Sequence, residues 1–203
     1  MRRLHWRCRA VTLLAVLPGL AAAGVLEVQV QDRAGRPLGD AVVFLESASA
    51  RAAVRPAALV EIAQVNRNFD PAVTVVPVGT AVSFPNRDAV RHHVYSFSPT
   101  KKFELKLYVG TPLAPVVFDQ PGIAVLGCNI HDQMAAWVVV VPTPYYGRAG
   151  ADGVVKLGLV PPGAYRLRTW HADLPVGAPA AEQALVVEAA PQRVNARLDG
   201  VGS

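Results

Sequence analysis

The amino-acid sequence predicts an all-β protein, built as an antiparallel sandwich or barrel. Most apolar residues fall in short runs, several of which alternate apolar and polar positions. The 17 prolines and 16 glycines separate most of these runs. No stretch has the strong periodicity of an amphipathic helix. Many short strands with regular turn residues between them are typical of antiparallel sandwiches and barrels.

The first 23 residues are expected to precede the fold. "MRRLHWRCR" is basic, "AVTLLAVLPGL" is apolar but too short to span a bilayer, and "AAA" at 21–23 fits a cleavage site. We predict a cleavable signal peptide at residues 1–23 and a periplasmic location; a retained anchor is the alternative. After cleavage we expect no stable insertion into a membrane.

Removal of this segment changes the charge balance. It contains four of the 20 basic residues and none of the 15 acidic ones, which leaves 16 basic residues against 15 acidic ones. A phosphate-binding surface needs a surplus of Lys and Arg. The near-neutral remainder therefore argues against a nucleic-acid partner.

The strands are expected in the following order. Residues 25–32 alternate, residues 41–46 form a second strand, and the Gly and Pro of "RAGRPLG" turn the chain between them. Residues 51–59 form a connection. Further short strands are predicted at 60–65, 72–78, 81–86, 92–98, 102–109, 114–119, 122–128 and 135–141.

The sequence pattern changes after "PTPYYG", where longer alternating runs begin. Residues 152–174 contain two alternating strands joined by a Pro-Pro-Gly turn. Two more strands are predicted at 182–189 and 192–200, after a loop rich in Ala, Pro and Gly.

The cysteine count indicates a special role for one thiol. The signal segment takes Cys8 with it, so Cys128 remains as the only cysteine. An exported protein with one thiol forms no internal disulfide, and an unpaired cysteine in an oxidising compartment needs a reason. Cys128 is either buried and inert or a metal ligand.

Three potential metal ligands recur at intervals of three residues in "LGCNIHDQMAAWVVVV". Cys128, His131 and Met134 are soft or borderline donors that suit copper better than magnesium, calcium or manganese. Two histidines, a cysteine and a weak axial methionine form the blue-copper arrangement, so a second histidine must come from elsewhere. "FPNRDAVRHHVYSF" supplies His92 and His93. Zinc is the alternative metal, although methionine is a poor zinc ligand.

Residues 60–142 resemble the cupredoxins, the type 1 copper proteins. The Cys-x-x-His-x-x-Met loop has the spacing of the amicyanin loop, and "NFDPAVTVVPVGTAVSFPNRDAVRHHVYSF" follows the family's upstream pattern. The resemblance implies a Greek-key β-sandwich with one mononuclear type 1 copper, held by His92, Cys128, His131 and Met134. His93 stands where the family usually has an asparagine, and it is the alternative to His92 as ligand.

The flanking segments resemble a carboxypeptidase-regulatory-like β-sandwich. "VQVQDRAGRPLGDAVVFLE" and "GADGVVKLGLVPPGAYRLRTW" hold its usual features, with the cupredoxin-like part between them. We therefore expect residues 24–50 and 150–200 to form one small sandwich together. A cupredoxin domain at 60–142 is either inserted into this sandwich or flanked by it. A single larger sandwich with extra edge strands is the alternative. His171 in this module is a candidate second metal contact or docking residue, or an ordinary surface histidine.

Together these features predict an exported one-electron carrier, not an enzyme. The implied partners are redox proteins such as a dehydrogenase or a cytochrome. Two other functions stay open: copper binding and delivery with the same ligands, and a recognition module without redox chemistry. Tyr95 and Trp137 are expected to be core residues and not redox relays.

Overall fold

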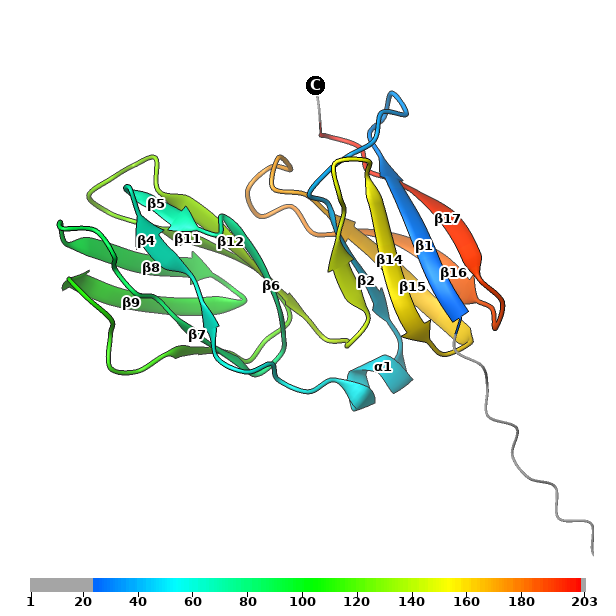
Figure 1. The fold of residues 1–203 in the computed structure, drawn as a ribbon, viewed down its shortest axis with the longest axis horizontal. Coiled ribbons are helices and arrows are strands. Elements are labelled where there is room, and N and C mark those ends of the chain that lie inside the picture. Colours follow the sequence, from blue (N-terminus) through cyan, green and yellow to red (C-terminus); the bar gives the residue numbers. More distant parts are fainter. Residues whose placement is uncertain (1–23, 202–203) are drawn as a thin grey trace, which may run out of the picture.

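The computed structural model describes residues 24–201, and its fold is almost entirely β (Figure 1). The predicted all-β class is confirmed: several open sheets pack as sandwiches, with one short helix among the described residues. Between residues 24 and 201, no helix has the length and apolarity that a membrane crossing requires. The signal peptide predicted at 1–23 lies outside the described residues.

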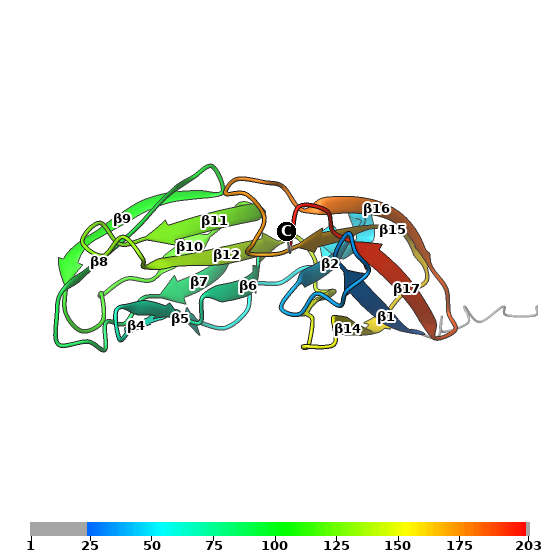
Figure 2. The ribbon, with the colours of Figure 1, turned by 90° about the horizontal axis from the view of Figure 1, so that it is seen from above.

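The strands between residues 60 and 141 form what we call the inner sandwich. Its larger sheet has five strands, and it faces two smaller sheets in Figures 1 and 2. The large sheet runs in the order β6 (Val73–Pro77), β12 (Ala135–Val141), β11 (Gly122–Gly127), β8 (His92–Ser98) and β9 (Lys101–Tyr108). The smaller sheets are β10 (Val116–Phe118), β7 (Thr80–Ser83) and β3 (Val60–Glu61), and the pair β4 (Ala63–Val65) and β5 (Asn68–Asp70).

The strands on either side of this segment pair with one another across the long interval in sequence. We call this part the outer sandwich; both described chain ends belong to it. Its two sheets are β14 (Val154–Val160), β1 (Gly24–Gln31) and β17 (Gln192–Arg197), and β13 (Tyr146–Arg148), β2 (Val42–Glu46), β15 (Gly163–Trp170) and β16 (Ala181–Val187). The predicted domain boundaries stay a prediction, and β13 lies between two of the predicted ranges.

Two details differ from the sequence-based expectation. The predicted connection at 51–59 begins inside a helix, α1 (Ala48–Ala53). Ser47 caps it, because its Oγ accepts a hydrogen bond from the backbone N–H of Ala50 at 3.0 Å. The alanines that follow favour a helix locally, although the segment is too short to show amphipathic periodicity.

The sheets are also mixed and not purely antiparallel. β12 pairs with β6, β1 with β17, and β3 with β7 in parallel. Parallel neighbours need a crossover connection, and here the chain passes through the facing sheet before it returns. The short turns visible in the sequence predict only antiparallel pairs between consecutive strands, so the parallel pairs could not be predicted from them.

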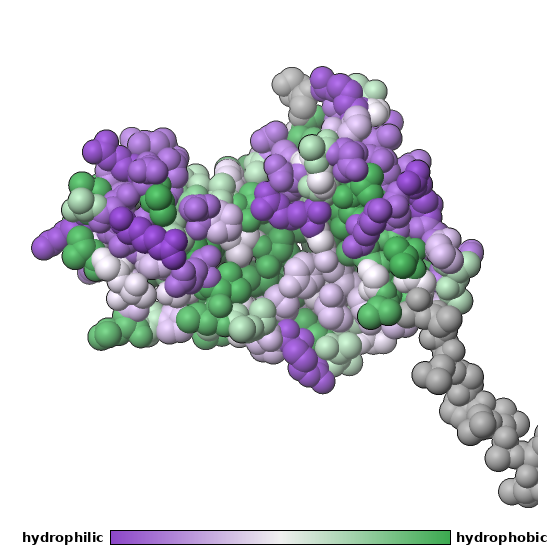
Figure 3. Space-filling view, in the orientation of Figure 1, coloured by the Kyte–Doolittle hydropathy of each residue, from purple (hydrophilic) through white to green (hydrophobic). Residues whose placement is uncertain are grey.

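The Val-rich strand β12 is buried on both faces. Val138 and Val140 point into the core of the inner sandwich, whereas Val139 and Val141 pack against Phe44 of the outer sandwich. Continuous apolar runs are typical of strands covered on both sides. The apolar junction between the sandwiches therefore explains why "WVVVV" does not alternate. Figure 3 shows hydrophobic surface near the middle of the molecule, where the sandwiches meet.

Candidate metal centre

Three donor atoms from two separate segments converge at one end of the inner sandwich. Cys128 Sγ lies 4.0 Å from His92 Nδ1 and 3.8 Å from His131 Nδ1. All three donor atoms lie within 4.8 Å of one another. His92 and Cys128 are buried, and His131 is partly exposed. The structure thus brings together residues 36 positions apart in the chain.

The spacing of these donors fits one shared metal ion. Metal bonds of about 2.0 Å to imidazole nitrogen and 2.3 Å to thiolate sulfur place two such donors at most about 4.3 Å apart. Both sulfur–nitrogen distances fall inside that limit. Two imidazole nitrogens with one thiolate are a donor set for zinc or copper, not for magnesium or calcium.

The loop before β8 is fastened so that His92 enters the core. Asn86 is buried, and its Nδ2 donates to the carbonyl oxygens of Val90 and Tyr108, each at 2.8 Å. The hydroxyl of Tyr108 donates to the carbonyl of Phe84 at 2.6 Å. Burial raises the pKa of Tyr108 to about 12, so this hydroxyl keeps its proton at neutral pH. These bonds tie the loop to β9 on one side of the donor cluster.

Asp88 sets the orientation of the His92 ring. His92 Nε2–H donates to Asp88 Oδ2 at 2.7 Å, which leaves the Nδ1 lone pair free to face Cys128. Burial alone raises the pKa of the Asp88 carboxyl, but the backbone N–H groups of Arg67 and Asn66 and the His92 ring together lower it below its ordinary value. Asp88 is therefore a carboxylate at neutral pH.

Sequence reasoning assigned no role to Asp88. The available signal was an acidic residue four positions before the first histidine. Metal-binding histidines commonly donate their second ring N–H to a carboxylate, which fixes the ring and raises its basicity.

The second segment is a tight turn between β11 and β12. Cys128 follows directly after β11, and the backbone N–H of Met134 donates to the carbonyl of His131 at 3.0 Å. The Met134 side chain is 1% exposed and belongs to the same apolar cluster as Cys128. The turn therefore directs the methionine side chain inward, into the apolar cluster that also contains Cys128.

The other two histidines of the described chain lie outside this cluster. His93 points to the opposite face of β8, where its Nε2 lies 3.0 Å from Glu104 Oε1 without hydrogen-bond geometry. His171 is buried in the outer sandwich: its Nε2–H donates to the carbonyl of Gly39 at 3.0 Å, and its Nδ1 accepts from the backbone N–H of Asp173 at 3.1 Å. Both ring nitrogens of His171 are engaged within that module, so its observed role is structural.

Comparisons with known proteins return partial structural matches. No protein-family model matches the chain, and no curated protein matches it. A purple cupredoxin from Nitrosopumilus maritimus is 22% identical, with a TM-score of 0.36, over 40% of this chain and 99% of that one. A Cu(I) form of an amicyanin mutant is 23% identical, with a TM-score of 0.37, over 49% of this chain and 98% of that one.

A further match is a Cu-containing nitrite reductase from Thermus scotoductus SA-01. It is 27% identical, with a TM-score of 0.38, over 40% of this chain, and the chain spans only 22% of its length. The structural neighbours are thus cupredoxins and a larger copper enzyme. Each superposition covers less than half of this chain.

Proposed function

We propose that this protein is an exported type 1 copper protein that carries single electrons between redox partners. The observation that supports it most is the convergence of His92 Nδ1, Cys128 Sγ and His131 Nδ1 in a largely buried site. In this proposal these three residues are the strong ligands and Met134 is the weak axial ligand. Copper, when bound, supplies the Cu(II)/Cu(I) couple.

The donor set favours copper over zinc. Structural zinc sites are closed by four Cys, His or carboxylate ligands. Here the candidate fourth ligand is the thioether of Met134, which belongs to the same buried cluster as Cys128, and methionine is the axial ligand in the blue-copper arrangement. Asp88 is the acidic residue that could replace methionine as a fourth ligand for zinc. Its carboxylate already accepts hydrogen bonds from His92 Nε2–H and from the backbone N–H groups of Asn66 and Arg67.

The orientation of the two adjacent histidines favours His92 over His93 as the ligand. Neighbouring residues of a strand point to opposite faces. His92 faces Cys128, whereas His93 faces Glu104 and packs edge-on against Tyr95, with ring centroids 5.9 Å apart. Ligation by His93 would require β8 to rotate about its axis.

The burial of the donors favours electron transfer over copper delivery. His92 is 0% exposed and Cys128 is 4% exposed, so an incoming chelating protein reaches neither without local unfolding. The hydrogen bond from His92 to Asp88 holds the first histidine in one orientation, and the hydrogen bonds of Asn86 hold the loop that carries it. A rigid site of this kind needs little rearrangement between oxidation states. An electron, unlike the ion, leaves such a site without opening it.

The proposal extends to partners and location. His131 is the most exposed of the three donors, and the apolar residues Val90 and Ile130 are solvent-exposed in the two loops that bring the donors together. A redox protein such as a dehydrogenase or a cytochrome would meet the site at this end. We place the protein in the periplasm and assign it no enzymatic reaction of its own.

The first experiment is to express the full chain with its leader, add Cu(II), and record visible absorption and electron paramagnetic resonance spectra. We expect an intense thiolate-to-copper band and narrow copper hyperfine splitting. Cys128→Ser removes the thiolate and should abolish the band, and His171→Gln, which changes a histidine of the outer sandwich, should leave it intact. A blue Cys128→Ser variant, or colourless copper-treated protein, contradicts the proposal.

A further inference from the structure

One face of β8 holds a row of aromatic rings. His93, Tyr95 and Phe97 are alternate residues and so point to the same side of the sheet. The ring centroids lie 5.9 Å apart between His93 and Tyr95, and 5.1 Å apart between Tyr95 and Phe97. Phe97 is 74% exposed, so its ring is open to an approaching molecule.

The middle ring of this row covers the backbone next to the thiol. Gly127 is the cross-strand partner of Tyr95 and directly precedes Cys128. A Cβ on Gly127 would lie 2.7 Å from Tyr95 Cζ, so the ring occupies the space that a side chain at this position would take. The middle ring of the aromatic row therefore lies over the peptide that leads into Cys128.

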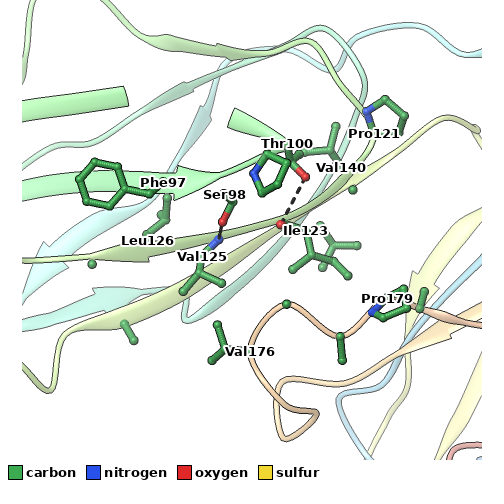
Figure 4. Close-up of a pocket in the computed structure, with 18 of the residues that line it drawn as sticks. Phe97, Ser98, Thr100, Pro121, Ile123, Val125, Leu126, Val140, Val176 and Pro179 are labelled. Atoms are coloured by element: carbon green, nitrogen blue, oxygen red, sulfur yellow. Dashed lines mark hydrogen bonds between the residues drawn. The ribbon is translucent and has the colours of Figure 1, made fainter. Parts of the chain in front are cut away.

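The row ends in a cavity between the two sandwiches. This cavity has a volume of about 1130 Å³, and Tyr95, Phe97, Gly127 and Cys128 are among the residues that line it. Figure 4 shows Ile123 and Val125 of β11 on one side and the loop with Val176 and Pro179 of the outer sandwich on the other. The volume slightly exceeds the range of about 300 to 1,000 Å³ that is typical of sites for small organic ligands, so a compact organic group fits inside it.

We propose that Tyr95 and Phe97 form a second electron-transfer port, leading from the Cys128 thiolate into this cavity. The inference rests on the proposed copper function and adds a route that does not pass through His131. One electron leaves the reduced site and reduces one oxidised acceptor, with no bond made or broken and no proton transferred. The two rings shorten the gap between donor and acceptor and are not themselves oxidised.

The lining of the cavity indicates the kind of acceptor. Apolar side chains form most of both walls, and three arginines and two acidic residues also line the cavity: Arg51, Arg166, Arg168, Glu46 and Asp132. Arg51 and Arg168 are each hydrogen-bonded to a glutamate, which leaves Arg166 as the arginine most open to a ligand. Its Nη atoms lie 3.6 Å from Glu46 and 3.9 Å from Glu182, beyond hydrogen-bond distance, and its side chain is 54% exposed. A compact apolar one-electron carrier with an anionic substituent fits this combination, because its apolar body would contact Phe97 and its anion would take the guanidinium donors.

Ferrocene derivatives provide matched probes. Each oxidised probe has a compact ferrocenium body that carries one positive charge; ferrocenecarboxylate adds an anionic substituent and is neutral overall, whereas (trimethylammoniomethyl)ferrocene adds a cationic one. We would mix each with the reduced copper protein and follow the return of the blue band by stopped flow. Tyr95→Leu and Phe97→Leu should each slow oxidation by ferrocenecarboxylate several-fold, while Tyr95→Phe, which keeps the ring, should match the unaltered protein.

Two further comparisons separate a port from a structural role. Arg166→Gln should slow the reaction of the anionic probe and leave that of the cationic probe unchanged. None of these variants alters a ligand, so the position of the blue band and the reduction potential should stay constant. Phe97 is exposed, so Phe97→Leu tests the port without a risk to folding.

A readout on the metal-free protein completes the test. Reduced ferrocenecarboxylate, added to metal-free protein, should shift the methyl resonances of Val125 and Val176 and leave those of Leu113, outside the cavity, unmoved. A blue, redox-active protein whose Tyr95→Leu and Phe97→Leu variants react at the unaltered rate overturns the port alone. Methyl shifts confined to Ile130, beside His131, also overturn it. A protein with no blue band overturns the proposed function, and the port falls with it.

Discussion

At the scale of single residues, Asp88 decides which nitrogen of His92 faces the candidate metal. Its carboxylate accepts the Nε2–H bond and thereby presents Nδ1 to Cys128. It also accepts the backbone N–H bonds of Asn66 and Arg67, so the same carboxylate closes the neighbouring loop. One acidic side chain thus links a ligand's orientation to the surrounding backbone.

Asp88→Asn should weaken copper binding by about 10- to 100-fold, the usual effect of removing the outer partner of a histidine ligand. The amide keeps the shape but loses the charge that makes the ring basic. Competition with a chromogenic chelator measures the affinity. Asp132→Asn is the matched control, because Asp132 is an exposed acid directly beside His131. Equal affinities for the two variants would contradict the role of Asp88.

Gly127 is a second residue whose identity matters. A methyl group at this position would overlap the Tyr95 ring, which must then move away from the backbone. The sequence alone predicts that Tyr95 is an ordinary core residue. Its contact with Gly127 arises only because β8 pairs with β11.

At the scale of elements, the turn after β1 is held by one buried carboxylate. Asp32 Oδ1 accepts the backbone N–H groups of Ala34 and Arg36 at 2.8 Å and 2.9 Å, and Oδ2 accepts Arg36 Nε–H at 2.7 Å. The Arg36 backbone bond is the main cause that lowers the pKa of Asp32, and the Arg36 side chain adds to it against the opposing effect of burial. This turn directs the chain from β1 toward β2.

The lowered pKa predicts a pH dependence of stability. The contribution of the ionised Asp32 is fully present above the unfolded-state pKa of about 3.9, and it is lost as the pH falls through the lower folded-state pKa. Asp32→Asn should therefore lower the melting temperature at pH 7 and flatten its fall below about pH 4. Thermal unfolding of metal-free protein across this range measures both effects.

The control for this prediction is Asp199→Asn, which removes a carboxylate that makes one ion pair with Arg197 on the surface. Exposed pairs of this kind contribute little to stability. If the two variants lose the same stability at pH 7, the turn does not depend on Asp32.

At the scale of the whole molecule, the two sandwiches share an apolar junction. Phe44 of β2 and Trp170 of β15 pack with Val139 of β12, and the Trp137 and Trp170 rings lie 6.4 Å apart. Each sandwich also has its own core. The junction therefore joins two sandwiches that each have a separate apolar core. It also holds together the two walls of the cavity that Tyr95 and Phe97 line.

Phe44→Ala should loosen this coupling. Loss of a buried phenylalanine costs about 3 to 5 kcal/mol, and here the loss falls on the contact between the sandwiches. We expect calorimetry to resolve two unfolding transitions in the variant where the unaltered protein has one. Leu45→Ala is the matched control: Leu45 is the next residue, but it faces the core of the outer sandwich alone. Two transitions in the control, or one in Phe44→Ala, would contradict the coupling.

The sequence by itself determined the β class, most strand positions and the chemical nature of the donors. Alternating apolar residues and Pro or Gly turns are local properties, and Cys128, His131 and Met134 lie within one short loop. It also limited the first histidine to two adjacent residues. These features follow from interactions between near neighbours in the chain, so a linear pattern reports them.

Only the tertiary structure decided the rest. It turned His92 toward Cys128 and His93 toward Glu104, because the two faces of β8 meet different neighbours. It gave Asp88 a partner, paired strands in parallel across long intervals, and laid Tyr95 over Gly127. All of these features have the same physical reason. Each depends on which distant strand lies beside the residue, and the packing of whole sheets decides that arrangement. Patterns among near neighbours in the sequence do not contain this information.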